Sequence, residues 1–457
     1  MGEKQSTLEE RVVAAVRESE DELVAFVTDL VAFDTTARNV GDPPRDEAAL
    51  QEYLRGRLEA LGADVELWEP EPTGSGNLYV PDDLEFGGRP QLAARLPGVG
   101  GAAASAGLEG PGAGADKPRA GGRSLLLNGH IDAVSAEPRE LWTSDPFTAR
   151  LRDGKLFGRG TCDMKGGIAG FVHALEVLHR LGVRLAGDVI VATNTDEESS
   201  GAGSHAVVAR GIRADAGLCG EPTDLDVWVA CRGGVNFTIT IPGRTGHAEC
   251  AQPHWREGGA VNAIEKQLIV LDAVRRLREE WRSRPDQQHK YLSPADLVPT
   301  MVSGGEWMVT HPSQVTLTFD TQYMPNKVDA DGTGRSHREE IQRWIDAAAA
   351  ADPWLREHPL RWEWGNDIVP AEVPEDHPIV ELALGAAADL GRRTRIAGLD
   401  SWHDAAVFTR WAGTPTVSFG PGSIGAAHTV DEFVTVQDLV DHCAATALIL
   451  MRWCGVA

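Results

Sequence analysis

A histidine and an aspartate stand two positions apart where a run of leucines ends. In the segment LLLNGHIDAV (residues 125–134), His130 and Asp132 follow the apolar residues of a predicted buried strand. Side chains two apart on a strand point to the same face. The imidazole could therefore bind a metal ion while the carboxylate holds its second nitrogen. A buried histidine paired with a local aspartate is the ordinary alternative, and these two residues alone do not exclude it.

A second apolar run ends in three adjacent carboxylates. The segment DVIVATNTDEESSG (188–201) leads into Asp196, Glu197 and Glu198. Neighbouring carboxylates at a strand end repel one another, and a cation would relieve that repulsion. Two adjacent glutamates can also divide the work, one binding metal and the other staying free as a base. A solvated acidic loop is the alternative interpretation.

Three further segments place a polar residue beside a strand end or a helix start. Asp163 in GRGTCDMKGG (158–167) precedes a predicted helix, where it could equally cap the N-terminus, and the glycine spacing does not match a nucleotide-binding phosphate loop. Glu221 in GEPT (220–223) and His428 in AAHTVDEFV (426–434) each follow an apolar run. Ligands of open α/β sheets bind beyond the carboxyl ends of the strands. The five segments together predict a nitrogen- and oxygen-ligand site that suits Zn²⁺ or Co²⁺.

Alternating strands and helices are predicted to position these residues. A chain of 457 residues favours two domains. We expect an α/β catalytic domain, with a doubly wound, mostly parallel sheet, in two segments (1–228 and 367–457). Its first element is predicted as one helix over about 9–33. The intervening segment, 229–366, has the order β-α-β-β-α-β, which predicts an inserted ferredoxin-like α+β domain.

Composition narrows the possible partners. The formal net charge is −25, from 43 Lys and Arg against 68 Asp and Glu, which argues against nucleic acid and anionic membrane surfaces. Six scattered cysteines without a C-x-x-C pair indicate reduced thiols in a cytoplasmic protein. No signal peptide or membrane-spanning segment is predicted. The Gly- and Ala-rich stretch 98–122 is interpreted as an insertion, to which no function is assigned.

Seven motifs occur in one order: NGHIDAV, GRGTCDMKGG, TDEESSG, GEPT, GRTGHAE, GGAVNAI and AAHTVDEFV. With these motifs the chain resembles the acetylornithine deacetylase, succinyl-diaminopimelate desuccinylase, aminoacylase and carboxypeptidase G family of dinuclear zinc hydrolases, which have a zinc-exopeptidase-like fold. The resemblance implies two Zn²⁺ ions per chain, with Co²⁺ as an alternative. It implies three ligands for each ion, with one shared: His130, Asp163 and Glu221 for the first, and Asp163, Glu198 and His428 for the second. It also implies that Glu197 is the general base and that Asp132 orients His130.

The resemblance further implies a reaction and an assembly. A hydroxide shared by the two ions would attack an amide carbonyl and release an N-acyl group from an amino acid or a related small amine. The inserted domain would act as a lid and form a homodimer, in which His247 stabilises the oxyanion in the partner's active site. A dipeptidase or carboxypeptidase and an N-carbamoyl-amino-acid hydrolase remain alternatives with the same site. A non-catalytic binding protein of this fold would be expected to lack a ligand or the base, and none is missing.

Substrate contacts are less well indicated. Many family members have an Arg in a D-x-R-x-x-P stretch that meets a substrate carboxylate, and Gln322 stands at that position here. A neutral amide cannot replace the charged two-pronged contact of an Arg, so a strongly anionic acyl group such as succinyl is less expected. Arg232 and Arg256 could compensate, although each could equally be an ordinary surface charge. Asn262 and Asp404 are further candidate substrate contacts.

Overall fold

The chain forms two compact units. The computed structural model describes residues 2–37, 43–71, 84–99 and 122–457, so the Gly- and Ala-rich stretch lies outside the described residues except at its ends. Unit 1 comprises Met1–Ala230, Ala371–Gly398 and His403–Ala457. Unit 2 comprises Cys231–Pro370 and Leu399–Trp402. The assignment of Leu399–Trp402 to unit 2 has no counterpart in the sequence prediction, which ends the inserted domain at residue 366.

A sheet forms the centre of unit 1. Among the described residues its strands lie in the order β1-β2-β6-β3-β7-β15-β8-β13, with β14 paired to β8. Their bounds are β1 Asp64–Trp68, β2 Gln91–Leu96, β3 Leu125–His130, β6 Val189–Asn194, β7 Ala216–Cys219, β8 Val227–Cys231, β13 Ala371–Glu372, β14 Ile396–Leu399 and β15 Thr416–Ser418.

The central strands of this sheet are parallel. β3 pairs in parallel with β6 and β7, and β7 pairs in parallel with β15. β2 is antiparallel to both β1 and β6, and β8 is antiparallel to β15, so the sheet is mixed towards its edges. All residues of β3 and β6 are buried, as expected for strands covered on both faces. The predicted doubly wound α/β fold is confirmed, with more antiparallel pairing than the sequence indicated.

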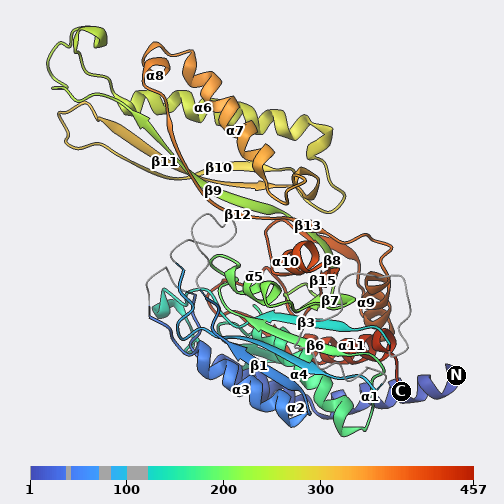
Figure 1. Cartoon of the computed structure of the whole chain (residues 1–457). Coiled ribbons are helices and arrows are strands. Elements are labelled where there is room, and N and C mark those ends of the chain that lie inside the picture. The colour runs from blue at the N-terminus through green and yellow to red at the C-terminus, as the bar shows by residue number, and fades with distance from the viewer. Residues whose placement is uncertain (1, 38–42, 72–83, 100–121) are drawn as a thin grey trace. The chain divides into compact units, whose positions relative to one another are not determined.

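Helices cover both faces of the sheet (Figure 1). α1, α2, α3, α4 and α11 lie on one face, and α5 and α10 lie on the other. α4 and α11 are buried almost all round because they lie between the sheet and outer helices. The bounds are α1 Gly2–Glu18, α2 Glu20–Val31, α3 Glu47–Ala60, α4 Lys165–Arg180, α5 Ala202–Ala209, α9 Pro378–Asp389, α10 Ala405–Val407 and α11 Val436–Cys454.

The single N-terminal helix predicted over 9–33 is wrong. The structure has two helices, α1 and α2, separated at Ser19. The Ser19 hydroxyl lies 2.9 Å from Nε2 of His173 in α4, and it also bonds the carbonyl oxygen of Ala15. The contact with His173 anchors the break to the buried helix α4. An apolar repeat read along the sequence does not reveal such a break, because both helices keep the same buried face.

A small three-stranded sheet joins two distant loops of unit 1. β4 (Arg150–Arg152), β5 (Lys155–Phe157) and β16 (Phe433–Thr435) pair in the order β16-β5-β4. β16 and β5 are antiparallel, with Phe433 opposite Phe157. This pairing brings the residues just before β16 next to the residues just after β5.

None of the described helices has the length and apolar character needed to cross a membrane.

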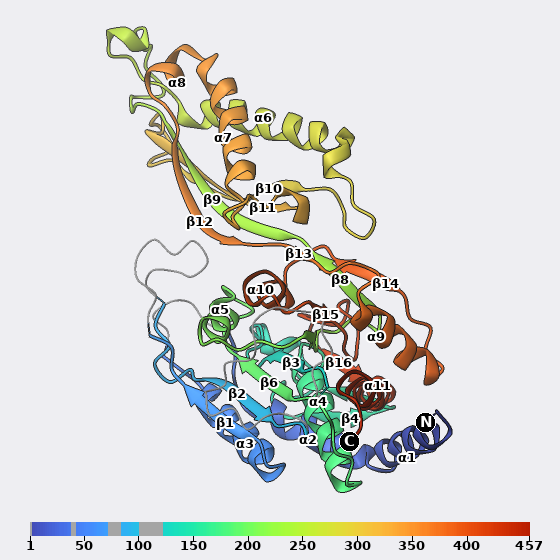
Figure 2. The ribbon, with the colours of Figure 1, turned by 45° about the vertical axis from the view of Figure 1, so that its right-hand side comes forward.

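Unit 2 has its own sheet and core. The strands β9 (Gly233–Pro242), β10 (Asp296–Gly304), β11 (Gln314–Tyr323) and β12 (Arg361–Ile368) lie in the antiparallel order β10-β11-β9-β12. α6 (Ala263–Ser283) and α7 (Arg335–Ala350) cover one face, and the short α8 (Pro353–Glu357) follows α7 (Figure 2). The chain order β-α-β-β-α-β and this strand order make unit 2 ferredoxin-like.

Candidate metal centre

Four neighbouring parallel strands deliver polar side chains to one edge of the unit 1 sheet. β3 ends at His130, β6 leads to Glu197 and Glu198, β7 leads to Glu221, and β15 leads into the loop that carries His428. Parallel neighbours end at the same edge, which is where open α/β sheets place their ligands. The pattern of apolar runs thus accounts for the convergence of these residues.

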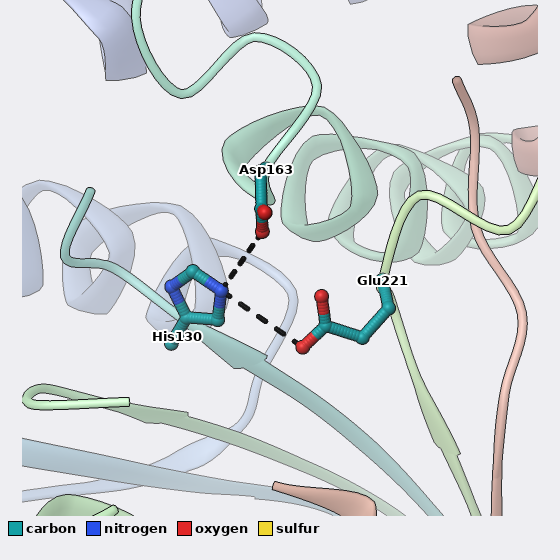
Figure 3. Close-up of side chains that lie close together, drawn as sticks. All are labelled: His130, Asp163 and Glu221. Carbon is teal, nitrogen blue, oxygen red and sulfur yellow. Dashed lines mark hydrogen bonds and ion pairs between the residues drawn. The ribbon is translucent and has the colours of Figure 1, made fainter. Parts of the chain in front are cut away.

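His130, Asp163 and Glu221 form the first cluster (Figure 3). Nε2 of His130 lies 3.1 Å from Oδ1 of Asp163 and 3.9 Å from Oε1 of Glu221. All three residues are buried. One donor atom from each lies within 4.8 Å of the others, a spacing that a single metal ion could span.

Asp163, Glu198 and His428 form the second cluster. Nε2 of His428 lies 3.3 Å from Oδ2 of Asp163 and 3.0 Å from Oε2 of Glu198. Asp163 therefore faces His130 with one carboxylate oxygen and His428 with the other. His428 has a φ of 60°, in the left-handed region that non-glycine residues rarely adopt. Such backbone conformations concentrate at functional sites.

Close backbone packing places Asp163 near Glu221. Gly167, in the first turn of α4, lies against the main chain of Gly220, the residue before Glu221. A Cβ added at Gly167 would lie 2.1 Å from the carbonyl oxygen of Gly220, so no other residue fits without movement. Gly167 of GRGTCDMKGG thus serves close helix–loop packing, in agreement with the exclusion of a phosphate loop.

Asp132 contacts the cluster in a different way from the one predicted. Nδ1 of His130 donates to the main-chain carbonyl of Asp132 at 2.9 Å, while the nearest carboxylate oxygen lies 3.7 Å away. The carboxylate instead accepts the backbone N–H of Glu197 at 3.3 Å and of Glu198 at 3.1 Å. The main chain of Asp132, rather than its carboxylate, thus orients the imidazole and leaves Nε2 facing Asp163.

Asp196 does not belong to either cluster. Its carboxylate forms a buried ion pair with Arg89 and also accepts the hydroxyl of Thr195 at 2.8 Å. A φ of 65° turns the chain at Asp196. The repulsion expected among three adjacent carboxylates is therefore reduced here by an arginine, and only Glu197 and Glu198 face the clusters. Oε2 of Glu197 lies 4.0 Å from Nε2 of His130.

The electrostatics of the site favour a bound cation. Burial raises the pKa values of Glu197 and Glu221 well above their ordinary range, and it raises the pKa of Asp132 to about 8. Hydrogen bonds to Asp163 and Glu198 raise the pKa of His428 to about 10. Burying negative charge without a compensating cation is costly, so in the absence of a metal ion these carboxylates and His428 retain protons. Divalent cations would replace those protons, and the nitrogen and oxygen donors fit Zn²⁺ or Co²⁺.

The predicted residues in unit 2 have local partners. His247 is exposed, and its Nδ1 accepts the backbone N–H of Glu249 at 3.3 Å. Asn262 caps α6 by accepting the N–H of Ile264 at 2.9 Å. Arg232 donates to the carbonyl oxygens of Asp400 and Pro294 at 2.7 and 2.9 Å, Arg256 pairs with Glu357, and Gln322 donates to Asp320. These contacts account for the residues locally and assign none of them to a substrate.

Three further buried residues lie near the clusters. Asp404 was predicted as a substrate contact, whereas Arg159 and Glu432 were not predicted as site residues. Asp404 is fully buried and accepts the side-chain N–H of Asn194 at 2.6 Å. Arg159 and Glu432 form a buried ion pair. Both residues lie inside motifs that carry predicted metal ligands, GRGTCDMKGG and AAHTVDEFV, and this position in the sequence could have indicated a role at the site. Their pairing across the chain was not visible in sequence.

Comparisons with known proteins agree on one family. The model of peptidase family M20/M25/M40 matches residues 126–452. The chain is 27% identical over 473 aligned positions to the N-formyl-4-amino-5-aminomethyl-2-methylpyrimidine deformylase of Halalkalibacterium halodurans, with 99% of this chain and 98% of that protein covered. It is 32% identical over 350 positions to the succinyl-diaminopimelate desuccinylase of Gluconacetobacter diazotrophicus, covering 73% of this chain and 82% of that protein.

A solved structure shares the fold over nearly the whole chain. The tripeptidase from Staphylococcus aureus aligns with a TM-score of 0.69 and 17% sequence identity, covering 95% of this chain and 98% of that one. At this identity the likeness concerns the fold alone.

Proposed function

The chain belongs to peptidase family M20/M25/M40 and is a hydrolase of amide bonds, and from this premise we propose a dinuclear metal-dependent enzyme that removes a small N-acyl group from an amine. The observation that carries the proposal is the position of Asp163. One of its oxygens faces His130 and the other faces His428, the arrangement needed for a carboxylate shared by two ions.

We propose that His130, Asp163 and Glu221 hold one ion, and that Asp163, Glu198 and His428 hold the other. Zn²⁺ is the proposed metal, with Co²⁺ as the alternative, because imidazole and carboxylate donors suit both. When bound, such ions polarise a carbonyl and lower the pKa of water. Three carboxylates against two dications leave the site positive, which favours a developing oxyanion.

Glu197 is the proposed general base. Its side chain is only 10% exposed, lies 4.0 Å from Nε2 of His130 in the first cluster, and belongs to neither cluster. Burial raises the pKa of Glu197, which makes its deprotonated carboxylate a stronger base, able to take a proton from the attacking water and hold it. It would then deliver the proton to the leaving nitrogen as the amide bond breaks. Asp132 supports this role because its carboxylate holds the backbone N–H of Glu197.

The proposed substrate carries a small, neutral acyl group of the formyl class on an amine. The deformylase relative aligns over nearly the whole of both chains, whereas the desuccinylase relative covers 73% of this chain. Gln322 stands where an Arg would meet an anionic acyl group, and its neighbour on the same strand face is acidic Asp320. A dipeptide or an N-carbamoyl amino acid is the alternative substrate.

A homodimer through unit 2 is proposed as the assembly, with His247 completing the partner's active site. Supporting it, β10 lies at the edge of its sheet and exposes Met301 and Val302, and the following loop exposes Trp307 and Met308. Edge strands with exposed apolar side chains are prone to pair with another chain.

A cytoplasmic location stays a prediction.

Metal content and a substrate panel test the proposal together. The protein, purified without chelators, would be measured by inductively coupled plasma mass spectrometry and then assayed with N-formyl, N-acetyl and N-succinyl amines and dipeptides. About two ions per chain and a preference for formyl amines would support it. Absence of metal after incubation with Zn²⁺ and Co²⁺ would overturn the mechanism. A preference for succinyl amines or dipeptides would overturn only the substrate.

A further inference from the structure

A buried ion pair lies next to Asp163, the residue that belongs to both clusters. Nη1 of Arg159 donates to Oε2 of Glu432 at 2.5 Å, and neither residue is more than 2% exposed. The other carboxylate oxygen of Glu432 accepts two backbone N–H groups, from Cys162 at 2.9 Å and from Asp163 at 3.1 Å. Glu432 thus divides its two oxygens between an arginine and the main chain of the shared carboxylate residue.

The same pair reaches the other two ligand loops. Nη2 of Arg159 donates to the carbonyl oxygen of Ser135 at 3.1 Å, in the loop that follows His130. The main-chain carbonyl of Glu432 accepts the N–H of Gly158 at 2.9 Å, and Glu432 itself follows His428 by four residues. One ion pair therefore ties together the loops that carry His130, Asp163 and His428.

We propose that Arg159 and Glu432 form a positioning pair that sets Asp163 between the two histidines and thereby governs how tightly both metal ions bind. The inference rests on the proposed function. A carboxylate that must serve two ions tolerates little displacement, because ligand geometry has to hold to within about 0.5 Å. The bonds from Glu432 to the two N–H groups are charge-assisted, which makes them stronger than neutral ones.

A purely structural ion pair would behave differently. Arg57 and Glu176 form a two-pronged pair in the same unit, with both bonds at 2.9 Å, and they join α3 to α4. That pair touches no ligand loop. Its loss should lower stability without changing metal affinity, so Glu176→Gln is the matched control for Glu432→Gln.

The test compares Glu432→Gln, Arg159→Lys and Glu176→Gln with the wild type. The metal-free proteins would be titrated with Zn²⁺ in competition with a chromophoric chelator, the visible absorption of Co²⁺-loaded protein would be recorded, and thermal unfolding of the metal-free forms would be followed. We expect Glu432→Gln to weaken binding of at least one ion about 10- to 100-fold, the usual effect of losing a partner that orients a ligand. Its Co²⁺ spectrum should change, and its activity should recover at saturating Zn²⁺.

Arg159→Lys keeps the charge but replaces the two donor nitrogens that reach Glu432 and Ser135 with a single one, so it should weaken metal binding in the same direction. If Glu432→Gln does not fold, Arg159→Lys decides the question. Wild-type affinity and an unchanged Co²⁺ spectrum in the folded variants would overturn the inference and leave the proposed function standing. Failure of the wild type to bind two ions would instead overturn the proposed function.

Discussion

Asp132 accepts the backbone N–H of Glu198 at 3.1 Å, although 66 residues separate them in the sequence. The same carboxylate accepts the N–H of Glu197, so it holds the turn from which the two glutamates diverge. Glu198 then lies 3.0 Å from Nε2 of His428, while Oε2 of Glu197 lies 4.0 Å from Nε2 of His130. Two neighbouring residues of the same type are thus placed for different tasks.

The first prediction separates those two tasks. Glu197→Gln should lower kcat about 10²- to 10⁴-fold, the range for loss of a general base, and should keep both metal ions. Glu198→Gln should lose one ion because an amide is a poor replacement for the carboxylate ligand. Metal content and steady-state kinetics of both variants provide the measurement. Equal metal loss in the two variants would contradict the division of roles.

Metal binding should release protons. In the metal-free protein the pKa of His428 is about 10, because Asp163 and Glu198 bond the protonated ring. At pH 7 an ion must displace that proton, so apparent affinity should rise with pH up to about pH 10 and fall as pH decreases. Calorimetric titration of Zn²⁺ in two buffers with different ionisation enthalpies measures the number of protons released. A value of zero would contradict the protonated state of His428.

Asp196 should contribute to stability and not to metal binding. Asp196→Asn leaves Arg89 charged and buried without its ion partner, which costs about 3–5 kcal/mol. Asparagine tolerates the left-handed backbone at this position, so the turn itself should survive. Urea unfolding measures the loss, and metal content should remain at two ions per chain. The exposed pair Arg180–Glu22 is the control, with less than about 1 kcal/mol expected for Glu22→Gln.

Unit 2 should lose stability in mild acid through His337. This buried histidine is stacked between Trp281 and Tyr323, and burial lowers its pKa to about 3. The unfolded chain, with a pKa near 6.5, therefore binds more protons than the folded one between about pH 6.5 and pH 3. The free energy of unfolding should be fully present above about pH 6.5 and decline towards pH 3.

Tryptophan fluorescence during urea unfolding at several pH values measures this dependence. His337→Gln removes the titrating ring, so its unfolding midpoint should vary less with pH over the same interval. An equal pH dependence in the variant and the wild type would assign the acid sensitivity to other groups.

Local sequence accounts for much of the fold and for the identity of the donor residues. The apolar runs before His130, Glu197 and Glu221 predict strands, because short continuous apolar runs are typical of strands covered on both faces. Parallel strands then bring their carboxyl ends together. The break at Ser19 escaped prediction because it depends on a hydrogen bond to a helix more than a hundred residues away.

The sequence by itself determined which residues stand at the strand ends, since strand formation follows from the local pattern of apolar side chains. It did not show that Asp196 turns away from the clusters that Glu197 and Glu198 face. It also did not show that Asp132 contacts His130 through its main chain and not through its carboxylate. Those distinctions were decided by Arg89, by the N–H groups of Glu197 and Glu198, and by the Arg159–Glu432 pair. Hydrogen bonds and ion pairs depend on distance and direction between distant segments, and only the tertiary structure sets those.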